Sequence, residues 1–515
     1  MLSTLPNIKK ITLKKTVMLC SFLFTGYAML AQTAPAIEWQ KTFGGTANDG
    51  ARNIKPTADG GFIIVGSSAS VDGDVTQNNG ASDFWIVKTN SLGTIEWQKT
   101  YGGSNGDIGQ DAIQLQDGSY AVVGTLGMYD PNGQGTNGDI WVLKLDNEGN
   151  LEWEETLGGS ANDSALSIMQ DNNGNLVITG TTNSIDGDVT NNNGGLDAWI
   201  VKMGLTGTII WQKTFGGPSA EVAESIIQTA DGGYIFCGYK AGNLYGQFWV
   251  VKIDVDGNMQ WENTYGGSGE DWPSNIEATT DGGYIIGGES ISNDGDVTGA
   301  HGFLDYWIVK INATGTLQWQ KTLGGSGNDQ FSRVKQTADG GYVVAGFSDS
   351  NNGDSAPNNG GNDIWVVKLD AQAAVVWQKS YGGSSNESAF NLVLLPDGSV
   401  AVAGNTYSTD GNVTGNHGGS DYWLLKLAPE VLSTPQISKN TFSLYPNPNN
   451  GTFTIGKDIL LEQDASISVY STLGQLVYIS KITSATVAVP NLAAGMYQVQ
   501  LLSGKTSYSQ KLVIK

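Results

Sequence analysis

Short runs of apolar residues recur along most of the chain, separated by turns rich in glycine, asparagine and aspartate. Residues 83–103, DFWIVKTNSLGTIEWQKTYGG, show the unit: two strand-like runs, a tight hairpin and a closing double glycine. The second tryptophan of this unit returns at Trp39, Trp97, Trp153, Trp211, Trp261, Trp319 and Trp377. The first returns at Trp85, Trp141, Trp199, Trp249, Trp307, Trp365 and Trp423. Such a period indicates a repeat architecture.

Each repeat contains four strand-like segments. In the first full cycle they are residues 53–57, 62–67, 83–89 and 95–101, and the glycine-containing segments 58–61 and 90–93 are typical of hairpin turns. Residues 62–65, FIIV, are continuously apolar, as expected for a strand covered on both faces. Four antiparallel strands repeated seven times predict an all-β, seven-bladed β-propeller over residues 37–427.

The repeated elements GGSxND, DGGYIIxG and DYWIVKLDxxGxxxWQKTxGG resemble SBBP repeats, the seven-bladed β-propeller repeats of secreted bacterial proteins. The resemblance covers roughly residues 37–427. It implies the fold and says little about activity, since fold alone does not define function.

The two ends of the repeat region are incomplete in complementary ways. The first copy begins with an outer-type strand at residues 37–43, whereas the last copy, ending near Leu427, lacks its fourth strand. We therefore expect the N-terminal strand to complete the last blade and close the ring.

The segments outside the repeats have different compositions. Residues 1–31 combine four lysines with a short apolar stretch, which predicts a signal peptide. Residues 428–441, APEVLSTPQISKNT, are expected to be a linker. Residues 442–515 alternate apolar strands with Pro and Gly turns, which predicts a small Ig-like β-sandwich. No segment of the mature chain is long and apolar enough to suggest a transmembrane helix.

Motifs in this last region, YPNP at 445–448, VYSTLG at 469–474 and LAAGMY at 492–497, resemble the C-terminal sorting domain of type IX secretion substrates. The resemblance implies a Bacteroidetes-like origin, export through the periplasm to the outer-membrane surface or medium, and contact with the type IX machinery. It also implies that the tail is removed during delivery.

Charge and cysteine content narrow the classes of partner. The net charge is −23, and it becomes −27 once the four leader lysines are removed. This argues against nucleic acid as a partner and permits cations, basic proteins or neutral glycans. One of the two cysteines, Cys20, lies in the leader, so Cys237 has no intrachain partner in the processed chain.

Motifs that resemble catalytic ones have weak context. The G-x-S-x-G match at residues 102–106 sits in a repeated loop without a following helix, and the only histidines are His301 and His417. We therefore predict a non-enzymatic binding or interaction module with a glycan or protein ligand. A secreted hydrolase or lyase with an acidic site on the long-loop face is the alternative, and a structural spacer is a third hypothesis.

Seven carboxylates occupy one repeated position, four residues after the double glycine. The loops that carry them share a face with the long DGD-containing loops, opposite the hairpin turns. They could form a ring that binds a cation or basic ligand, or they could accept backbone N–H bonds and set the turn. These residues are Asp49, Asp107, Asp163, Glu221, Asp271, Asp329 and Glu387.

The long loops repeat oxygen-bearing side chains at alternate positions, as calcium loops do. The glycine expected at the sixth position is replaced by Gln77 in the first loop and Asn191 in the second. Calcium is thus the one candidate cofactor, and plain Asx-rich turns are the alternative. The candidate ligands are Asp72, Asp74, Thr76 and Asp83 in the first loop, Asp186, Asp188, Thr190 and Asp197 in the second, and Asp294, Asp296, Thr298 and Asp305 in the third.

Overall fold

The computed structural model describes residues 33–129, 137–242, 245–430, 442–456, 465–471, 476–482, 484–490, 492–503 and 506–515. The predicted signal peptide and most of the predicted linker lie outside the described residues. The described residues belong to two compact units, 33–430 and 442–515.

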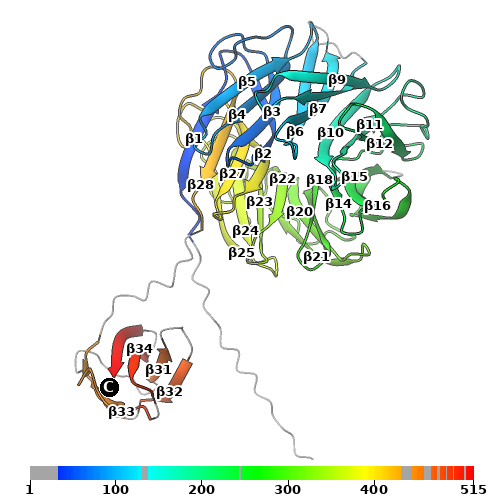
Figure 1. Cartoon of the computed structure of the whole chain (residues 1–515). Coiled ribbons are helices and arrows are strands. Elements are labelled where there is room, and N and C mark those ends of the chain that lie inside the picture. The colour runs from blue at the N-terminus through cyan, green and yellow to red at the C-terminus, as the bar shows by residue number, and fades with distance from the viewer. Residues whose placement is uncertain are drawn as a thin grey trace, which may run out of the picture. The chain divides into compact units, whose positions relative to one another are not determined.

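The larger unit is a ring of seven four-stranded antiparallel sheets, so the prediction of a seven-bladed propeller is confirmed. Figure 1 shows the blades following one another from blue to yellow around a centre lined by the first strand of each. The first three blades are β2 (Asp49–Pro56), β3 (Phe62–Ser68), β4 (Asp83–Thr89) and β5 (Ile95–Tyr101); β6 (Gly106–Gln114), β7 (Tyr120–Tyr129), β8 (Asp139–Leu145) and β9 (Leu151–Leu157); and β10 (Asp163–Gln170), β11 (Leu176–Thr182), β12 (Asp197–Met203) and β13 (Ile209–Phe215).

The next three blades keep this order from the channel outward. They are β14 (Ser225–Gln228), β15 (Tyr234–Ala241), β16 (Gly246–Ile253) and β17 (Met259–Tyr265); β18 (Asp271–Ala278), β19 (Tyr284–Ser290), β20 (Asp305–Ile311) and β21 (Leu317–Leu323); and β22 (Asp329–Gln336), β23 (Tyr342–Ser348), β24 (Asp363–Leu369) and β25 (Val375–Tyr381).

The seventh blade joins the two ends of the repeat region. Its inner strands are β26 (Glu387–Leu394), β27 (Val400–Thr406) and β28 (Asp421–Leu427), and its outer strand is β1 (Ile37–Phe43). Strand β1 pairs antiparallel with β28 from Ile37 opposite Leu427 to Phe43 opposite Tyr422, and Figure 1 shows the two side by side. The expected closure is therefore confirmed.

The apolar core of the propeller lies between neighbouring blades. One cluster, for example, joins Ile63 and Phe84 of the first blade to Tyr120 and Trp141 of the second. The third-strand tryptophans are at most 7% exposed, which explains their recurrence, because each fills the gap to the adjoining blade. Fourth-strand tryptophans lie against the next hairpin: Trp39 is so close to Gly93 that a Cβ there would lie 2.8 Å from the ring.

The smaller unit is a β-sandwich of two sheets around one apolar core. One sheet has the order β29 (Leu444–Tyr445), β30 (Thr452–Ile455), β33 (Thr486–Ala488), and the other β32 (Leu476–Lys481), β31 (Ser466–Ser471), β34 (Gly495–Ser503), β35 (Thr506–Ile514). Within the described residues, no helix has the length and hydropathy needed to cross a membrane.

Candidate functional site

The seven predicted ring carboxylates are buried, none more than 2% exposed. Asp49 accepts hydrogen bonds from the Gly45 backbone N–H at 2.8 Å and from the Ser68 and Ser70 hydroxyls. The N–H of the second loop glycine reaches the carboxylate in every blade, at Asp107, Asp163, Glu221, Asp271, Asp329 and Glu387. These are the contacts expected of turn-setting carboxylates; ligand binding by this ring stays a prediction.

A second carboxylate faces six of these seven. A Cβ added to Gly102 would lie 2.4 Å from Asp83 Oδ1 and 2.6 Å from Asp107 Oδ2, so both oxygens lie against the same glycine. One oxygen of each second carboxylate is buried without a hydrogen-bond partner in the described structure. The six residues are Asp83, Asp139, Asp197, Asp305, Asp363 and Asp421.

Burial raises the pKa of all six second carboxyls. For Asp363, burial and the adjacent Glu387 carboxylate raise the pKa to about 6. A proton on Asp363 would supply the missing donor between the two groups, because two carboxylates in contact share one proton rather than both ionising. In the fourth blade Gln247 takes the equivalent place beside Asp271, and its amide is neutral at every pH.

The side chains predicted to bind calcium accept hydrogen bonds from backbone and side-chain groups of the protein. In the first loop Asp72 accepts from the Thr46 N–H and hydroxyl, Asp74 from the Gly44 N–H, and Thr76 from Gln98. The second and third loops repeat this arrangement at Asp186, Asp188, Thr190, Asp294, Asp296 and Thr298. Over the described ranges no group of three or more His, Cys, Asp or Glu side chains could hold a metal ion. Calcium binding stays a prediction.

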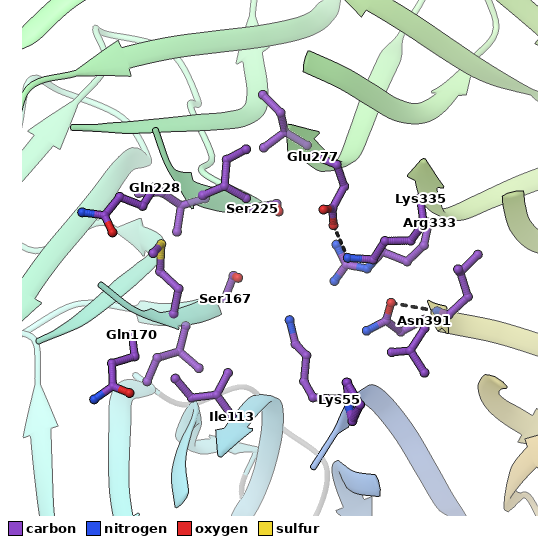
Figure 2. Close-up of a pocket in the computed structure, with 18 of the residues that line it drawn as sticks. Lys55, Ile113, Ser167, Gln170, Ser225, Gln228, Glu277, Arg333, Lys335 and Asn391 are labelled. Atoms are coloured by element: carbon purple, nitrogen blue, oxygen red, sulfur yellow. Dashed lines mark hydrogen bonds and ion pairs between the residues drawn. The ribbon is translucent and has the colours of Figure 1, made fainter. Parts of the chain in front are cut away.

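A cavity of about 730 Å³ occupies the channel at its opposite end, beside the hairpin turns. All seven inner strands contribute to its wall. Figure 2 shows Lys55 extending into this cavity, with Glu277, Lys335, Arg333 and Asn391 on one side and Ser167, Gln170, Ser225 and Gln228 on the other. No aromatic side chain lines the cavity among the described residues.

The cavity wall departs from the seven-fold repeat. The position six residues after each ring carboxylate holds, in blade order, Lys55, Ile113, Met169, Ile227, Glu277, Lys335 and Val393. Blades two to four therefore form a continuous aliphatic arc, whereas blades one, five and six supply charged groups. Since the same strand geometry tolerates both kinds of residue, the fold does not dictate the charges.

The charged side of the cavity is only partly neutralised. Lys335 pairs with Glu277, and burial lowers the pKa of Lys335. Lys55 Nζ lies 3.8 Å from Asp111 Oδ1, below the cavity surface. Arg333 donates to the Ser274 carbonyl at 3.2 Å and forms no ion pair within the described structure. A guanidinium has five N–H donors, so most of those on Arg333 are available.

The third strand of every blade carries a lysine, and these lysines form ion pairs that differ from the contacts of the basic residues in the cavity. In six of the seven blades the third-strand lysine reaches an aspartate of the hairpin turn, as in Lys88 with Asp59 at 2.7 Å and Lys252 with Asp231 at 2.7 Å. In the third blade, where the turn lacks that aspartate, Lys202 instead reaches Asp171 at 2.9 Å. These pairs join a buried lysine to an acid of the hairpin turn in every blade, and this regularity assigns them to the scaffold and distinguishes them from the basic groups of the cavity.

A second chamber of about 280 Å³ lies farther along the channel, and Arg333 lines both spaces. Its wall includes Arg52, whose guanidinium lies 5.3 Å from the centre of the Phe390 ring. Burial raises the pKa of Glu224 and of Glu289 to about 7. Both carboxyls are therefore partly protonated near pH 7, while the nearby Arg333 favours the ionised form of Glu224 and lowers its pKa.

The comparisons with known proteins identify the C-terminal region. Residues 443–515 match the family model of the secretion system C-terminal sorting domain. The chain is therefore an exported substrate of the type IX secretion system, delivered to the cell surface or secreted, and its tail interacts with the secretion machinery.

Three further proteins resemble this chain at low sequence identity. A structure of PorZ, a bacterial surface component of the type IX secretion system of Porphyromonas gingivalis, is similar with a TM-score of 0.39 and 11% identity, covering 92% of this chain and 60% of that one. A structure of a puromycin hydrolase is similar with a TM-score of 0.43 and 11% identity, and the match covers 73% of this chain and 53% of that one. The regulatory protein FlaEY of Caulobacter vibrioides is 23% identical over 221 residues, 39% of this chain and 23% of that protein. The chain thus spans less than two thirds of the length of each of these three proteins.

Sequence reasoning did not predict the cavity residues. The sequence pattern points to positions that hold the same residue type in every repeat. Lys55, Arg333, Lys335 and Glu277 lie at positions where the residue type changes from repeat to repeat. Aligning the seven inner strands by their ring carboxylates and asking where polarity varies would have found them.

Proposed function

We propose that the protein is an exported, non-enzymatic binding module that takes its ligand at the hairpin end of the propeller channel. One observation carries this proposal: the wall of that cavity breaks the seven-fold repeat with charged residues that the scaffold does not require. A concave space of this volume with a few convergent polar groups is typical of binding sites. Propellers also commonly host function along their central channel rather than in the blades.

The chemistry of the cavity supports binding over catalysis. Its described wall has hydroxyls at Ser167 and Ser225, yet neither histidine of the chain lines it to activate them. Ser167 donates to the buried Asp111 carboxylate, which already accepts the Ile168 N–H. A nucleophile needs an adjacent base that is free to take its proton. On the long-loop face, where the hydrolase or lyase alternative places its site, the ring carboxylates are buried, and the exposed aspartates Asp72, Asp186 and Asp294 accept hydrogen bonds from backbone N–H groups of the neighbouring loop.

The test is to screen the full chain on peptide and glycan arrays and then measure the bound ligands by calorimetry. The Arg333→Gln variant is compared with Lys41→Gln, which removes an exposed charge on outer strand β1. We expect saturable binding without product formation, weakened by the first substitution and unchanged by the second. Product formation would favour the enzyme hypothesis, and a lack of binding to both arrays would favour a structural spacer.

A further inference from the structure

Arg333 occupies a position that has a structural role in other blades. It is the fourth residue after the ring carboxylate, and the equivalent residues Asp111, Asn275 and Asn391 reach the backbone of the following blade. Asp111 accepts the Ile168 N–H, Asn275 bonds both the N–H and the carbonyl of Val334, and Asn391 donates to the Ile54 carbonyl.

Arg333 does not make this forward contact, and neither do the equivalent Asn53, Ser167 and Ser225 within the described structure. It donates back to Ser274 of the preceding blade, and its guanidinium lies at the junction of the two channel spaces. The sixth blade therefore has a cation at a position that links neighbouring blades in three of its counterparts. Arginine occurs at this position in the sixth blade alone, and a residue type that departs from its equivalents in the other blades is expected where function requires it.

The charges around the cavity select an anion. Three cations, Lys55, Arg333 and Lys335, line the cavity with one carboxylate, Glu277. Glu277 is paired with Lys335, and Asp111 lies 3.8 Å from Lys55, so Arg333 is the cation of the three that forms no ion pair within the described structure. The nearest acidic influence on it is the buried Glu224 carboxyl. In a recess that protein walls partly shield from solvent, an incoming anion interacts more strongly with these cations than it would in bulk water. The planar guanidinium fork matches a carboxylate with two parallel hydrogen bonds.

The opposite wall selects the rest of the ligand. Ile113, Met169 and Ile227 form an aliphatic arc across the cavity from the cations. Sugar rings are usually held by stacking on aromatic faces, and the described wall has none, so the arc favours an aliphatic side chain over a glycan. Entry along the axis of a closed ring of strands favours the end of a chain over a continuous segment.

We propose that the cavity binds the free C-terminal carboxylate of a peptide that ends in aliphatic residues. The carboxylate lies on Arg333 with Lys55 nearby, and the last side chains pack on Ile113, Met169 and Ile227. This inference rests on the proposed function, because it names the ligand class of that same cavity. Capture of a terminal carboxylate is a known mode of peptide recognition.

The experiment uses the full chain and a random octapeptide library made in two forms, with free C-terminal carboxylates and as C-terminal amides. Selected peptides are titrated by calorimetry. We expect aliphatic C termini to be enriched, and the amide of each selected peptide to bind about tenfold more weakly or worse, as expected for losing a charged hydrogen bond. This comparison needs no protein variant, so it is independent of folding defects.

Two variants locate the carboxylate. Arg333→Gln should reduce affinity by about tenfold or more, and Arg333→Lys should give an intermediate loss because it keeps charge without the fork. Lys41→Gln should leave affinity unchanged, and thermal melts establish that each variant is folded. Equal binding of acid and amide, an unchanged affinity in Arg333→Gln, or no selected peptide would overturn the inference.

A parallel titration with oligogalacturonate separates this inference from the proposed function. Binding of that acidic glycan, with loss in Arg333→Gln and no peptide binding, would overturn the peptide proposal and leave a binding module at the cavity. If neither probe class binds, both proposals fail.

Discussion

The two ends of the channel differ in how closely they obey the seven-fold repeat. At the long-loop end every blade carries a buried carboxylate with the same backbone partner. At the hairpin end, six residues farther along the same strands, the side chains range from lysine to glutamate to isoleucine. The position that the fold requires holds a carboxylate in every blade, and positions that the fold leaves free are where a single ligand can be recognised. The uniform end is scaffold, and the varied end is the candidate site.

The largest effect is expected from opening the ring on which both ends depend. Deleting residues 33–45 removes strand β1 and leaves the edge of β28 unpaired. The loss should remove most of the roughly 5–15 kcal/mol that keeps a domain folded, and the open edge should promote aggregation. Thermal melts and light scattering measure this. An unchanged melting temperature would contradict a closed ring.

Removing one uniform carboxylate should destabilise the fold without a specific effect on binding. Asp271→Ala is the cleanest choice, because its neighbour is the neutral Gln247. The substitution leaves the Gly267 N–H and the Ser290 and Ser292 hydroxyls without their acceptor. We expect a loss of about 2–4 kcal/mol in the free energy of unfolding, since each buried unsatisfied donor costs about 1–3 kcal/mol. Denaturant titration measures it.

Arg333→Gln, at the hairpin end of the channel, is the control for Asp271→Ala at the long-loop end. Its half-buried guanidinium makes one backbone hydrogen bond, so the unfolding curve should be nearly unchanged while ligand affinity falls. If Arg333→Gln destabilised the propeller as much as Asp271→Ala, the contrast between the two ends would disappear.

The paired carboxyls predict a pH dependence of stability. The pKa of Asp363 is raised to about 6 in the fold, so the native state holds its proton more tightly than the unfolded chain does. Stability from this group is therefore complete below pH about 4 and decreases as pH rises through about 6. Asp363→Asn, which keeps a donor toward Glu387, should raise the melting temperature at pH 7 and flatten its pH dependence.

The opposite substitution, Gln247→Glu, adds a carboxyl beside Asp271 and so creates a seventh pair of carboxyls. Gln247→Glu should lower stability at pH 7 by about 1–2 kcal/mol, roughly one pKa unit of unfavourable interaction, and have little effect at pH 4.5. Asp256→Asn, on an exposed hairpin, serves as the control for surface charge. A pH-independent effect of Gln247→Glu would show that the carboxyl pairs do not share protons.

The smallest effect is expected from chelation. The candidate calcium ligands already contact backbone N–H groups and neighbouring side chains, so removing calcium should leave the melting temperature unchanged. A calcium site filled at a hundred times its Kd would instead contribute about 2.7 kcal/mol. A rise of several degrees with millimolar calcium, absent in the Asp72→Asn, Asp74→Asn double variant, would establish the calcium loop.

The fold could be predicted from the sequence because its signal is repeated. Seven copies of each tryptophan and double glycine define the blade period, and the incomplete first and last copies predict how β1 joins β28. The sorting domain was equally accessible from its spaced motifs. The cavity was not, because its residues lie one per blade, about 56 positions apart, and meet only when the ring closes.

Prediction also failed to distinguish exposed from buried acids. Asp49 and Asp83 look like surface ligands in a glycine-rich sequence, yet both are fully buried. Nothing in the local pattern shows that the first loop glycine brings two carboxyls from different strands together. That contact depends on tertiary packing against a residue with no side chain.

The pairing of β1 with β28 also imposes an order of events on the growing chain. Ile37 is among the first propeller residues to be synthesised, and its partner Leu427 follows 390 positions later. Six blades can assemble as they emerge, each from local hairpins, but the seventh waits for nearly the whole repeat region. Until then β1 and the incomplete seventh blade both have strand edges without a hydrogen-bonding partner. Before the ring closes, these unpaired edges can pair with other chains and cause aggregation unless another molecule covers them. Pairing of β1 with β28 removes both edges.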